Sequence, residues 1–598
     1  MPTLVLGPLL RHVGETQATV WVETDAAAEV EVLVAAAGPG PEGAAARASA
    51  PTFRVEGHHY ALVLIGGLEP DRTYGYRVEL DGRRVWPEAR PDGPSFPAST
   101  IRTMHGDHPL RIAFGSCRVA APHEPPWTLP PSADRRRGKG ADALYTFALR
   151  MRDADPDTWP DLLLLLGDQI YADDASDQVQ DFIRSRRDPQ RPPGLEVADF
   201  EEYTRLYREA WGDPVLRWLL STVPTAMIFD DHDISDDWNT SAAWVEHMRR
   251  LPWWEERITS GLASYWLYQH LGNLSPDDLE DDPIWLKVRD AGDATRVLRE
   301  FALRADREVE GTRWSYRRDF GRTRLVVVDS RCGRVLEGPR REMVDDDEWA
   351  WIEEQATGDF DHLLLATSLP FALAPAVHDL EAWNEAVTAG AWGRLAARVG
   401  EKVRQGVDLE HWAAFHDSFD RLAALIESVA AGHRGRAPGS VVVLSGDVHH
   451  TYLAELSFRG EHAGHGHSPA WQAVCSPLRN PLPRDQRAAH RRAFRRPARV
   501  VAGWLARRAG VEPEAIAWRV VEGPRFDNHL GELELDGRSA MLRVERAVTP
   551  EDGRGNPRLE LLYEHRLAGG RGSGGLKPRP PEDRGSGGLK PSPPVDRG

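Results

Sequence analysis

The sequence has little cysteine, no excess of basic charge and no long apolar run. Its 598 residues include three cysteines, Cys117, Cys332 and Cys475, which are far apart and odd in number, so no disulfide framework is expected. Acidic residues outnumber basic ones by 92 to 74, and the net charge of −18 argues against a general nucleic-acid coat. No run of about 18 apolar residues occurs, so no membrane span is predicted.

The N-terminal sequence MPTLVLGPLLRHVG has no basic leader region, no twin arginine and no cleavage pattern of small residues. We therefore expect a cytoplasmic protein, or an exported one if a leader was removed before this numbering begins. The chain is too long for one ordinary core, so at least two domains are expected. A hydrophobic content of 41% and 21 tryptophans allow large buried cores.

Four short apolar runs end in ionisable or metal-ligating side chains. They are RIAFGSC (111–117), DLLLLLGDQIYADD (161–174), TAMIFDDHD (225–233) and VVVLSGDVHH (441–450). Each apolar run is typical of a strand buried in a parallel sheet, and open α/β sheets bind ligands at the carboxyl ends of their strands. Because desolvated carboxylates repel one another strongly, cations must neutralise such a cluster. A two-metal centre is the simplest account.

The chain divides into three parts by pattern. Residues 1–104 alternate polar and apolar residues as β-strands do, and the segment His58–Gly82 resembles a fibronectin type III or similar β-sandwich. Residues 105–568 alternate strands with helical stretches, the pattern of an α/β catalytic domain. Residues 569–598 contain a Pro- and Gly-rich repeat, RGSGGLKP, and are expected to be disordered.

Two segments are strongly basic. Arg135, Arg136, Arg137 and Lys139 form either a solvated charge run, the plainer interpretation, or a mobile basic lid that meets a phosphate. The stretch His490–Gly510 has the pattern of a basic amphipathic helix. It fits contact with a membrane or an anionic partner, although a solvated helix face is again the plainer interpretation.

The blocks GSCR, GDQIYAD, DDHD and SGDVHH, taken in this order, resemble the PhoD-like alkaline phosphatases, a branch of the calcineurin-like metallophosphoesterases. The resemblance runs loosely from about Val5 to Leu567. It implies a four-layer α/β/β/α core with an N-terminal fibronectin III-like β-sandwich. It also implies a metal-dependent phosphatase or phosphodiesterase that hydrolyses phosphate esters by in-line attack of a metal-bound hydroxide.

The resemblance implies six metal ligands at the ends of these strands: Cys117, Asp168, Tyr171, Asp231, Asp447 and His449. Fe(III) suits the thiolate, phenolate and imidazole among them. Ca(II), or else Mg(II) or Mn(II), suits the aspartates. Asp168 would bridge the two ions.

Five further residues receive roles from the same resemblance. His232 would protonate the leaving-group oxygen, and Arg118 would stabilise charge on the phosphoryl oxygens. Asn239 would add an oxygen to the second ion, and Arg331 would support the site or contact substrate. His450 would orient its neighbours, although a buried histidine bonded to the main chain explains it equally well.

One departure leaves an alternative open. The strand expected at His362–Phe371 ends in Thr367 and Ser368, where most calcineurin-like enzymes have a metal-binding histidine. A degenerate relative that binds a phosphorylated ligand without turnover is therefore the alternative function. The expected partner is a phosphate ester in either case, and the sequence specifies neither the substrate nor the oligomeric state.

Overall fold

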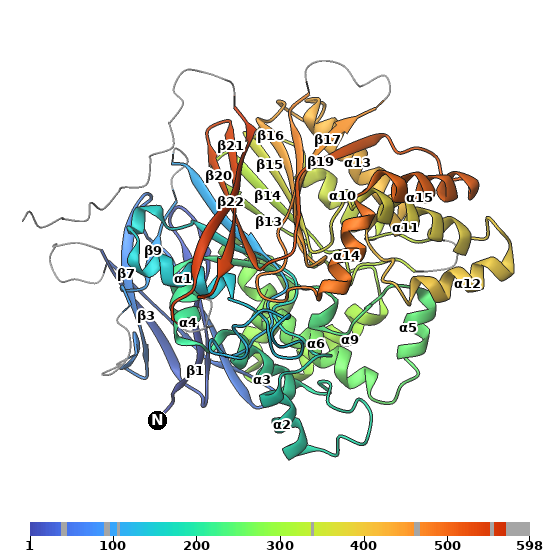
Figure 1. The fold of residues 1–598 in the computed structure, drawn as a ribbon. Coiled ribbons are helices and arrows are strands. Elements are labelled where there is room, and N and C mark those ends of the chain that lie inside the picture. The colour runs from blue at the N-terminus through green and yellow to red at the C-terminus, as the bar shows by residue number, and fades with distance from the viewer. Residues whose placement is uncertain are drawn as a thin grey trace, which may run out of the picture.

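The structure is a computed structural model that describes the chain except residues 37–44, 89–95, 105–107, 337–339, 460–466, 551–554 and 570–598. The predicted disordered tail, apart from Gly569, lies outside the described residues. The described strands form four sheets, two small ones in the first hundred residues and two large ones beyond (Figure 1). None of the described helices has the length and hydrophobicity that crossing a bilayer requires.

The N-terminal region is built from β-strands alone, as the alternation predicted. One sheet has the order β1-β2-β6-β5, and the other has the order β4-β3-β7-β8 with β9 paired to β7. The strands are β1 (Leu4–Val13), β2 (Ala18–Thr24), β3 (Glu29–Ala36), β4 (Ala46–Pro51), β5 (Phe53–Val55), β6 (His58–Ile65), β7 (Thr73–Leu80), β8 (Arg83–Trp86) and β9 (Thr100–Arg102). Side chains of both sheets share one core, so they form a sandwich. The domain boundaries at residues 104 and 568 stay predictions.

The first large sheet has six strands in the order β12-β11-β10-β20-β21-β22. The strands are β10 (Leu110–Gly115), β11 (Leu162–Leu166), β12 (Thr225–Ile228), β20 (His529–Asp536), β21 (Ser539–Val548) and β22 (Arg558–Ala568). The first three are parallel, and β20 to β22 continue the sheet in antiparallel pairs. The five leucines of β11 are all buried, so the buried strand predicted there is confirmed.

The second large sheet has seven strands in the order β13-β14-β15-β16-β18-β17-β19. They are β13 (Tyr316–Phe320), β14 (Thr323–Val328), β15 (His362–Thr367), β16 (Ser440–Ser445), β17 (Thr451–Phe458), β18 (Ala470–Val474) and β19 (Ile516–Arg525). Within it β14, β15, β16 and β18 run parallel. This sheet and the six-stranded one each contribute several parallel strands whose carboxyl ends are available to a site.

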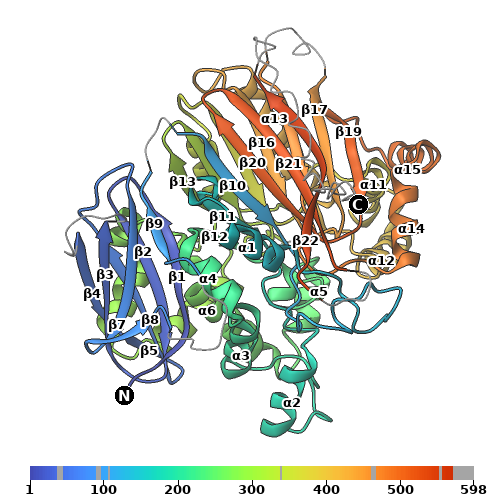
Figure 2. The same ribbon diagram turned by 60° about the vertical axis from the view of Figure 1, so that its left-hand side comes forward.

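Helices cover the sheets and give the mixed α/β class that the sequence predicted (Figure 2). They are α1 (Ala143–Asp153), α2 (Asp177–Arg186), α3 (Phe200–Trp211), α4 (Pro214–Thr222), α5 (Ala242–Met248), α6 (Trp254–Tyr268), α7 (Pro276–Asp281), α8 (Pro283–Ala291), α9 (Thr295–Arg307), α10 (Asp346–Gln355), α11 (Pro375–Thr388), α12 (Arg394–Arg404), α13 (His416–Ala430), α14 (Arg484–Ala493) and α15 (Arg496–Arg508), with short 3-10 turns η1 (Pro156–Thr158), η2 (Asp231–Asp233), η3 (His270–Asn273) and η4 (Trp412–Ala414).

The alternation of side chains along β14 shows how the layers are stacked. Leu325 and Val327 belong to the core that contains the leucines of β11, whereas Val326 and Val328 belong to a second core with residues of α10 and α13. Because successive side chains of a strand point to opposite faces, one face of the seven-stranded sheet packs toward the six-stranded sheet. Helices cover its other face.

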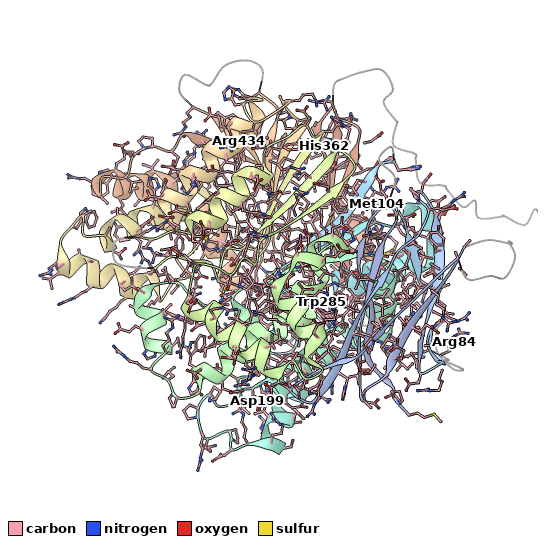
Figure 3. The ribbon with its side chains drawn as sticks, turned by 180° about the vertical axis from the view of Figure 1, so that it is seen from behind. Arg84, Met104, Asp199, Trp285, His362 and Arg434 are labelled. Atoms are coloured by element: carbon pink, nitrogen blue, oxygen red, sulfur yellow. The ribbon has the colours of Figure 1, made fainter. Side chains whose placement is uncertain are left out.

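The sandwich packs directly against the helices that follow β12. Trp21 of β2 lies 5.2 Å from the ring of Tyr268 in α6, and Tyr268 stacks on Tyr207 of α3 at 4.1 Å. Phe53 contacts Trp285 of α8 at 5.9 Å, where the helices meet the N-terminal strands (Figure 3). These side chains share one continuous core with the large sheets.

Arg11 of β1 joins the sandwich to the end of α6. Its side chain is fully buried, and it donates hydrogen bonds to the main-chain oxygens of Tyr268, at 2.7 Å, and of Gln269. A third bond, at 3.3 Å, reaches Oδ1 of Asn273. These carbonyls lie at the carboxyl end of α6, where a helix leaves acceptors without partners and where its dipole favours a cation.

We predict that Arg11→Met lowers the free energy of unfolding by about 3 kcal/mol, because two buried carbonyls lose this donor and Oδ1 of Asn273 loses one of its two donors. Equilibrium unfolding in urea measures the loss. The matched control is Arg47→Met, whose side chain is 64% exposed in a surface ion pair with Glu31 and which should cost less than about 1 kcal/mol. Equal losses in the two variants would show that Arg11 does not join the two regions.

Candidate active site

The carboxyl ends of parallel strands from both large sheets meet at one place. Asp447, after β16, donates its backbone N–H to Oγ of Ser116, after β10, at 3.1 Å. Sγ of Cys117 lies 3.4 Å from the main-chain oxygen of Asp447. Arg331, after β14, forms ion pairs with Asp230 and Asp231, after β12. The polar strand ends predicted to form one cluster therefore do come together.

The backbone at these strand ends is strained. Cys117, Asp168, Asp447 and His449 have φ angles of 55°, 52°, 62° and 50°, in the left-handed region that residues other than glycine rarely adopt. Each such conformation costs of order 1 kcal/mol and persists only where the surroundings enforce it. Four of them at one point indicate that the fold keeps these side chains in place for a function.

Four groups of side chains among the described residues are spaced to hold metal ions, and one of them, Asp173, His232 and Asp236, is only partly buried. The other three adjoin one another. Cys117, Asp168 and His449 form one group, Asp168, Asp231 and His232 form a second, and Asp230, Asp231 and Asp447 form a third, with one ligand atom from each residue within 4.8 Å of the others. Asp168 belongs to the first two groups and Asp231 to the last two, so the groups adjoin. Asp447 is grouped with Asp230 and Asp231 rather than with Asp168.

Tyr171 lies beside the first group. Its hydroxyl donates to Oδ2 of Asp168 at 3.3 Å and accepts from Nδ2 of Asn480 at 3.2 Å. Nζ of Lys139 lies 3.5 Å from Oδ1 of the same Asn480. Within the basic run that precedes it, Arg136 instead forms an ion pair with Asp177 at 2.9 Å. Lys139 thus brings a positive charge near the site, and Arg136 is held at the surface.

Burial determines the protonation of this cluster. It raises the pKa of Asp168 well above the ordinary value, with a further increase from the charges of Asp230 and Asp231. It likewise raises the pKa of the Cys117 thiol, and the carboxylates of Asp168 and Asp447 add to the effect. A cation is the kind of group that reverses such shifts. By contrast, burial lowers the pKa of His449 to about 4, which leaves a neutral imidazole able to ligate a metal.

Arg331 is the positive charge inside the carboxylate cluster. Its side chain is fully buried, and its guanidinium lies 2.6 Å from Glu410 Oε1, 3.2 Å from Asp231 Oδ1 and 3.8 Å from Asp447 Oδ1. Its Nε donates to Asp230. One guanidinium therefore faces four carboxylates, which it can neutralise only in part.

Two histidines are held by carboxylates at the edge of the cluster. Nδ1 of His232 lies 2.9 Å from Asp173. Nδ1 of His411 lies 2.7 Å from Glu381, and its Nε2 lies 3.0 Å from Asp447. Burial alone would lower the pKa of both histidines, but the neighbouring carboxylates outweigh it and raise the pKa of both.

The structure corrects the placement expected for Arg118. Its guanidinium forms a buried ion pair with Asp142 at 2.8 Å and donates to the main-chain oxygen of Ala210. Arg118 also lines a cleft of about 500 Å³ together with His123 and Tyr145. Because its side chain is bound there, the geometry gives no basis for the expected contact with a phosphate. The arginine among the carboxylates is Arg331.

Asn239 and His450 are both bonded to the main chain beside the cluster. The expected contribution of the Asn239 oxygen to the second ion stays a prediction. Nδ2 of Asn239 donates to the main-chain oxygen of Arg331 at 3.1 Å, so this amide supports the loop of Arg331. His450 binds the main-chain oxygen of Val448 through Nδ1 at 2.6 Å, and its ring lies 5.5 Å from that of Tyr452. Of the two interpretations of His450, the buried histidine bonded to the main chain is the one that the structure supports.

Several site residues received no role from the sequence. Asp173 stands inside the GDQIYAD block and Asp230 inside the DDHD block. An acidic residue next to predicted metal ligands could have been predicted to belong to the site. Glu410 lies just before η4, away from any strand end, so no local pattern marked it.

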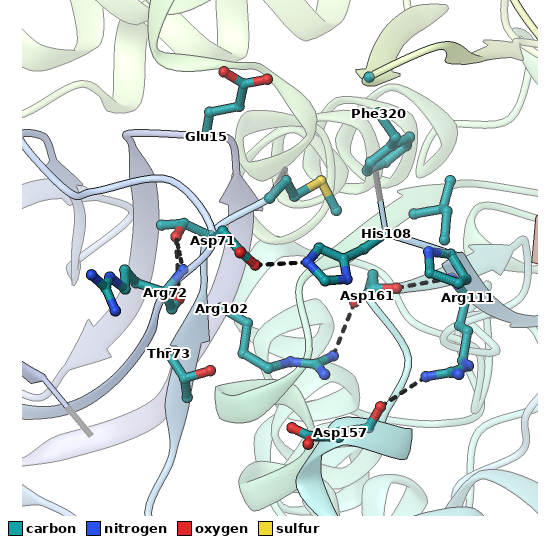
Figure 4. Close-up of a pocket in the computed structure, with 15 residues that line it drawn as sticks. Glu15, Asp71, Arg72, Thr73, Arg102, His108, Arg111, Asp157, Asp161 and Phe320 are labelled. Carbon is teal, nitrogen blue, oxygen red and sulfur yellow. Dashed lines mark hydrogen bonds and ion pairs between the residues drawn. The ribbon is translucent and has the colours of Figure 1, made fainter. Parts of the chain in front are cut away.

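A pocket of about 400 Å³ between the sandwich and β10 lies outside this site (Figure 4). It contains Arg102 and Arg111, but both guanidiniums are already occupied. Arg102 donates to the main-chain oxygen of Pro156 at 3.1 Å, and Arg111 donates to that of Asp157 at 2.8 Å. We assign this pocket no chemistry.

Comparison with known proteins identifies the family. The profile of the PhoD-like phosphatases matches residues 142–503, which is more than half of the chain. The chain belongs to the PhoD-like phosphatase family. The resemblance seen in the four sequence blocks is thereby confirmed. Residues 1–101 match a second profile, described as a domain of unknown function (DUF7800).

The structural comparison agrees with the family. A solved structure titled "Structure of PhoD" aligns with a TM-score of 0.56 at 13% identity, covering 95% of this chain and 91% of that one. At this identity the likeness shows a common fold. An alignment with a cyclomaltodextrinase has a TM-score of 0.16 at 9% identity, too low to indicate a shared fold. The search of curated proteins finds no match.

We predict that Gly446→Ala lowers phosphate ester hydrolysis about 100-fold, because a displacement of reacting groups by about 1 Å costs that much. A Cβ at Gly446 would collide with Ser116 and lie 2.9 Å from the main-chain oxygen of Leu166, so it would push the ends of β10, β11 and β16 apart. The control is Gly75→Ala, where a Cβ meets nothing within 4 Å. Full activity in Gly446→Ala would show that the contact between the two sheets is not required.

We predict that Arg331→Met lowers the stability of the metal-free protein by roughly 3–5 kcal/mol, because it leaves buried carboxylates without their counter-charge. Thermal unfolding measures the change, and added divalent cations should restore part of the loss. The control Arg322→Met removes a side chain that is 53% exposed beside Asp361, and it should cost no more than about 1 kcal/mol. An Arg331→Met protein as stable as the control would mean that the cluster does not need the guanidinium.

Proposed function

We propose that the chain is a metal-dependent hydrolase of phosphate esters, acting as a phosphatase or phosphodiesterase. The observation that supports this most is that residues of the blocks GSCR, GDQIYAD, DDHD and SGDVHH lie together where the carboxyl ends of the two large sheets meet. The chain also belongs to the PhoD-like phosphatase family. We further propose that the two sheets with their covering helices form a four-layer α/β/β/α core. The sandwich is proposed to be of fibronectin III type.

The donor atoms of the site fit metal ions. Oδ1 of Asp168 is buried and accepts no hydrogen bond from the described residues, so it is available to a metal ion. We propose that Cys117, Tyr171 and His449 would hold Fe(III) with Asp168, and that Asp231 and Asp447 would hold Ca(II), or else Mg(II) or Mn(II). Bound ions would neutralise the carboxylates, withdraw electrons from the phosphoryl oxygens and make water easier to deprotonate.

His232 is the proposed general acid. Asp173 accepts from its Nδ1 at 2.9 Å, which fixes the ring and turns Nε2 away from that carboxylate. The side chain remains 25% exposed, so a leaving group can reach it. Burial lowers the pKa of His232, but Asp173, Asp231 and Asp168 outweigh it and raise the pKa, which favours the protonated ring that a general acid needs. As the phosphorus–oxygen bond breaks, that proton passes from Nε2 to the leaving oxygen.

Arg331 and Lys139 take the electrostatic roles first expected of Arg118. Arg331 holds Asp230, Asp231 and Glu410 in fixed positions through its three nitrogens, so the carboxylates are oriented before substrate arrives. Lys139 supports Tyr171 through Asn480 and adds positive charge where a phosphate anion would approach. Local charge of this kind is needed because the net charge of −18 repels anionic substrates.

A second candidate function is the binding of a phosphorylated ligand without turnover. One observation favours it: the guanidinium of Arg331 lies 3.2 Å from Asp231 and 3.8 Å from Asp447 and therefore competes with a cation for the same carboxylates. In that case the protein would hold one ion at Cys117, Asp168 and His449, and the second ion would be absent.

We predict that the purified protein hydrolyses p-nitrophenyl phosphate or its bis ester, and that chelation removes the activity. Asp168→Asn should lower the rate at least about 1000-fold, because it removes the carboxylate shared by two ligand groups. Asp188→Asn, at a side chain that is 55% exposed, is the matched control and should act as the wild type. Unimpaired turnover in Asp168→Asn would contradict the proposal. Ligand binding without hydrolysis of either ester would favour the second candidate.

Elemental analysis and an absorption spectrum test the metals separately. Iron bound by a tyrosinate should give a visible charge-transfer band that Tyr171→Phe abolishes. Tyr145→Phe, which removes a half-buried hydroxyl outside the three ligand groups, should leave the band unchanged. A colourless protein with zinc alone would overturn the assignment of Fe(III).

A further inference from the structure

Helix α12 presents its apolar face to solvent. Leu395, Val399 and Val403 are spaced four residues apart, lie on one stripe and are 78%, 61% and 36% exposed. The side of the helix that is buried carries Gly400 and Arg404. A surface helix normally does the opposite and turns its apolar stripe to the core. The stripe on α12 is therefore without a partner in the described chain.

Helix α15 exposes a second apolar stripe nearby. Val500, Val501 and Trp504 are 66%, 60% and 52% exposed, while Ala502, Gly503 and Ala506 face the protein. Both helices pack on α11, and both views place them on the same side of the molecule (Figures 1 and 2). Nε1 of Trp392, just before α12, donates to the main-chain oxygen of Arg508 at 3.1 Å, which joins the end of α15 to the start of α12.

The same region is the most basic part of an acidic protein. The stretch from α14 through α15 contains nine arginines and one acidic residue, Asp485, although the whole chain carries −18. Among the described side chains of these nine arginines, an ion pair is found for Arg487, which lies 3.9 Å from Asp527. The exposed face of α12 adds Arg394, Arg398 and Lys402. Positive charge thus borders both apolar stripes and outnumbers the acidic side chains Asp379, Glu512 and Glu514 that line a pocket with Arg499 and Arg507.

We propose that this surface, formed by α12, α14 and α15, binds the surface of a lipid bilayer that carries anionic headgroups. Helices that lie in the plane of a bilayer combine an apolar face that includes Trp with a border rich in Arg and Lys. Each basic residue near an anionic bilayer contributes further attraction. A second copy of the chain is the poorer occupant, because a two-fold contact through this surface would place the same arginines against one another.

The surface adjoins the candidate site through α14. The ring of His490 in α14 lies 5.1 Å from that of His450, and His450 follows directly on His449. A protein bound to a bilayer through this surface would hold its candidate site close to the headgroup region. The inference does not rest on the proposed hydrolysis, because binding and turnover are measured separately.

Flotation of the full-length protein with vesicles tests the inference. We expect binding to vesicles of phosphatidylcholine with about 30% phosphatidylglycerol, at least about tenfold weaker binding to phosphatidylcholine alone, and loss of binding at high salt. The double variants Val500→Ser/Trp504→Ser and Arg492→Glu/Arg496→Glu should each weaken binding about tenfold or more. All variants should hydrolyse soluble p-nitrophenyl phosphate at the rate of the wild type.

Matched controls separate this surface from general effects. Leu561→Ser changes an apolar side chain of β22 that is 56% exposed, and Arg191→Glu changes a basic one that is 86% exposed, both outside the surface. Neither should alter vesicle binding. The proposal is overturned if anionic vesicles do not bind the wild type at low salt, or if the controls lose as much binding as the double variants. It is equally overturned if light scattering shows a dimer that the double variants dissociate while vesicles remain unbound.

Discussion

The structure depends on one electrostatic constraint: the carboxyl ends of two sheets meet, and most of the side chains placed there are acidic. Two unit charges about 4 Å apart interact with about 4 kcal/mol at the effective dielectric of a protein. Asp230, Asp231, Glu410 and Asp447 surround the guanidinium of Arg331, and Asp168 lies beside them. Glu410 also pairs with the buried guanidinium of Arg334 at 3.4 Å. The fold can bring these groups together only if positive charge comes with them.

The chain supplies part of that charge itself. Arg331 follows β14 in the seven-stranded sheet, yet it binds carboxylates that follow β12 in the six-stranded sheet, so the same ion pairs also hold the two sheets together. His411 bonds to Asp447, and His232 bonds to Asp173. Burial leaves His449 neutral, so in the group of Cys117, Asp168 and His449 the positive charge that acts on Asp168 is that of the neighbouring His232.

The sequence predicted the parts of the site that local patterns determine. An apolar run followed by ionisable or metal-ligating residues marks both a buried strand and the end at which a ligand binds, and β10, β11, β12 and β16 all carry that pattern. What the sequence did not predict depends on contacts across the fold. Arg118 follows a strand like its neighbours, but its guanidinium pairs with the buried Asp142, which belongs to none of the candidate ligand groups. The spacing of α12 marks an amphipathic helix without indicating which face is buried.

The sandwich takes part in positioning the same acidic residues. β12 is the edge strand of its sheet, and an edge strand has main-chain groups without a partner strand. Asn273 replaces that strand: its Oδ1 accepts from the N–H of Met227 at 2.9 Å, and its Nδ2 donates to the carbonyl of Met227 at 2.7 Å. Arg11 of the sandwich donates to the same Oδ1 at 3.3 Å. A chain of hydrogen bonds thus leads from β1 through Asn273 to β12, and Asp231 follows the last residue of β12 by three positions. The N-terminal region therefore supports the strand that carries the site.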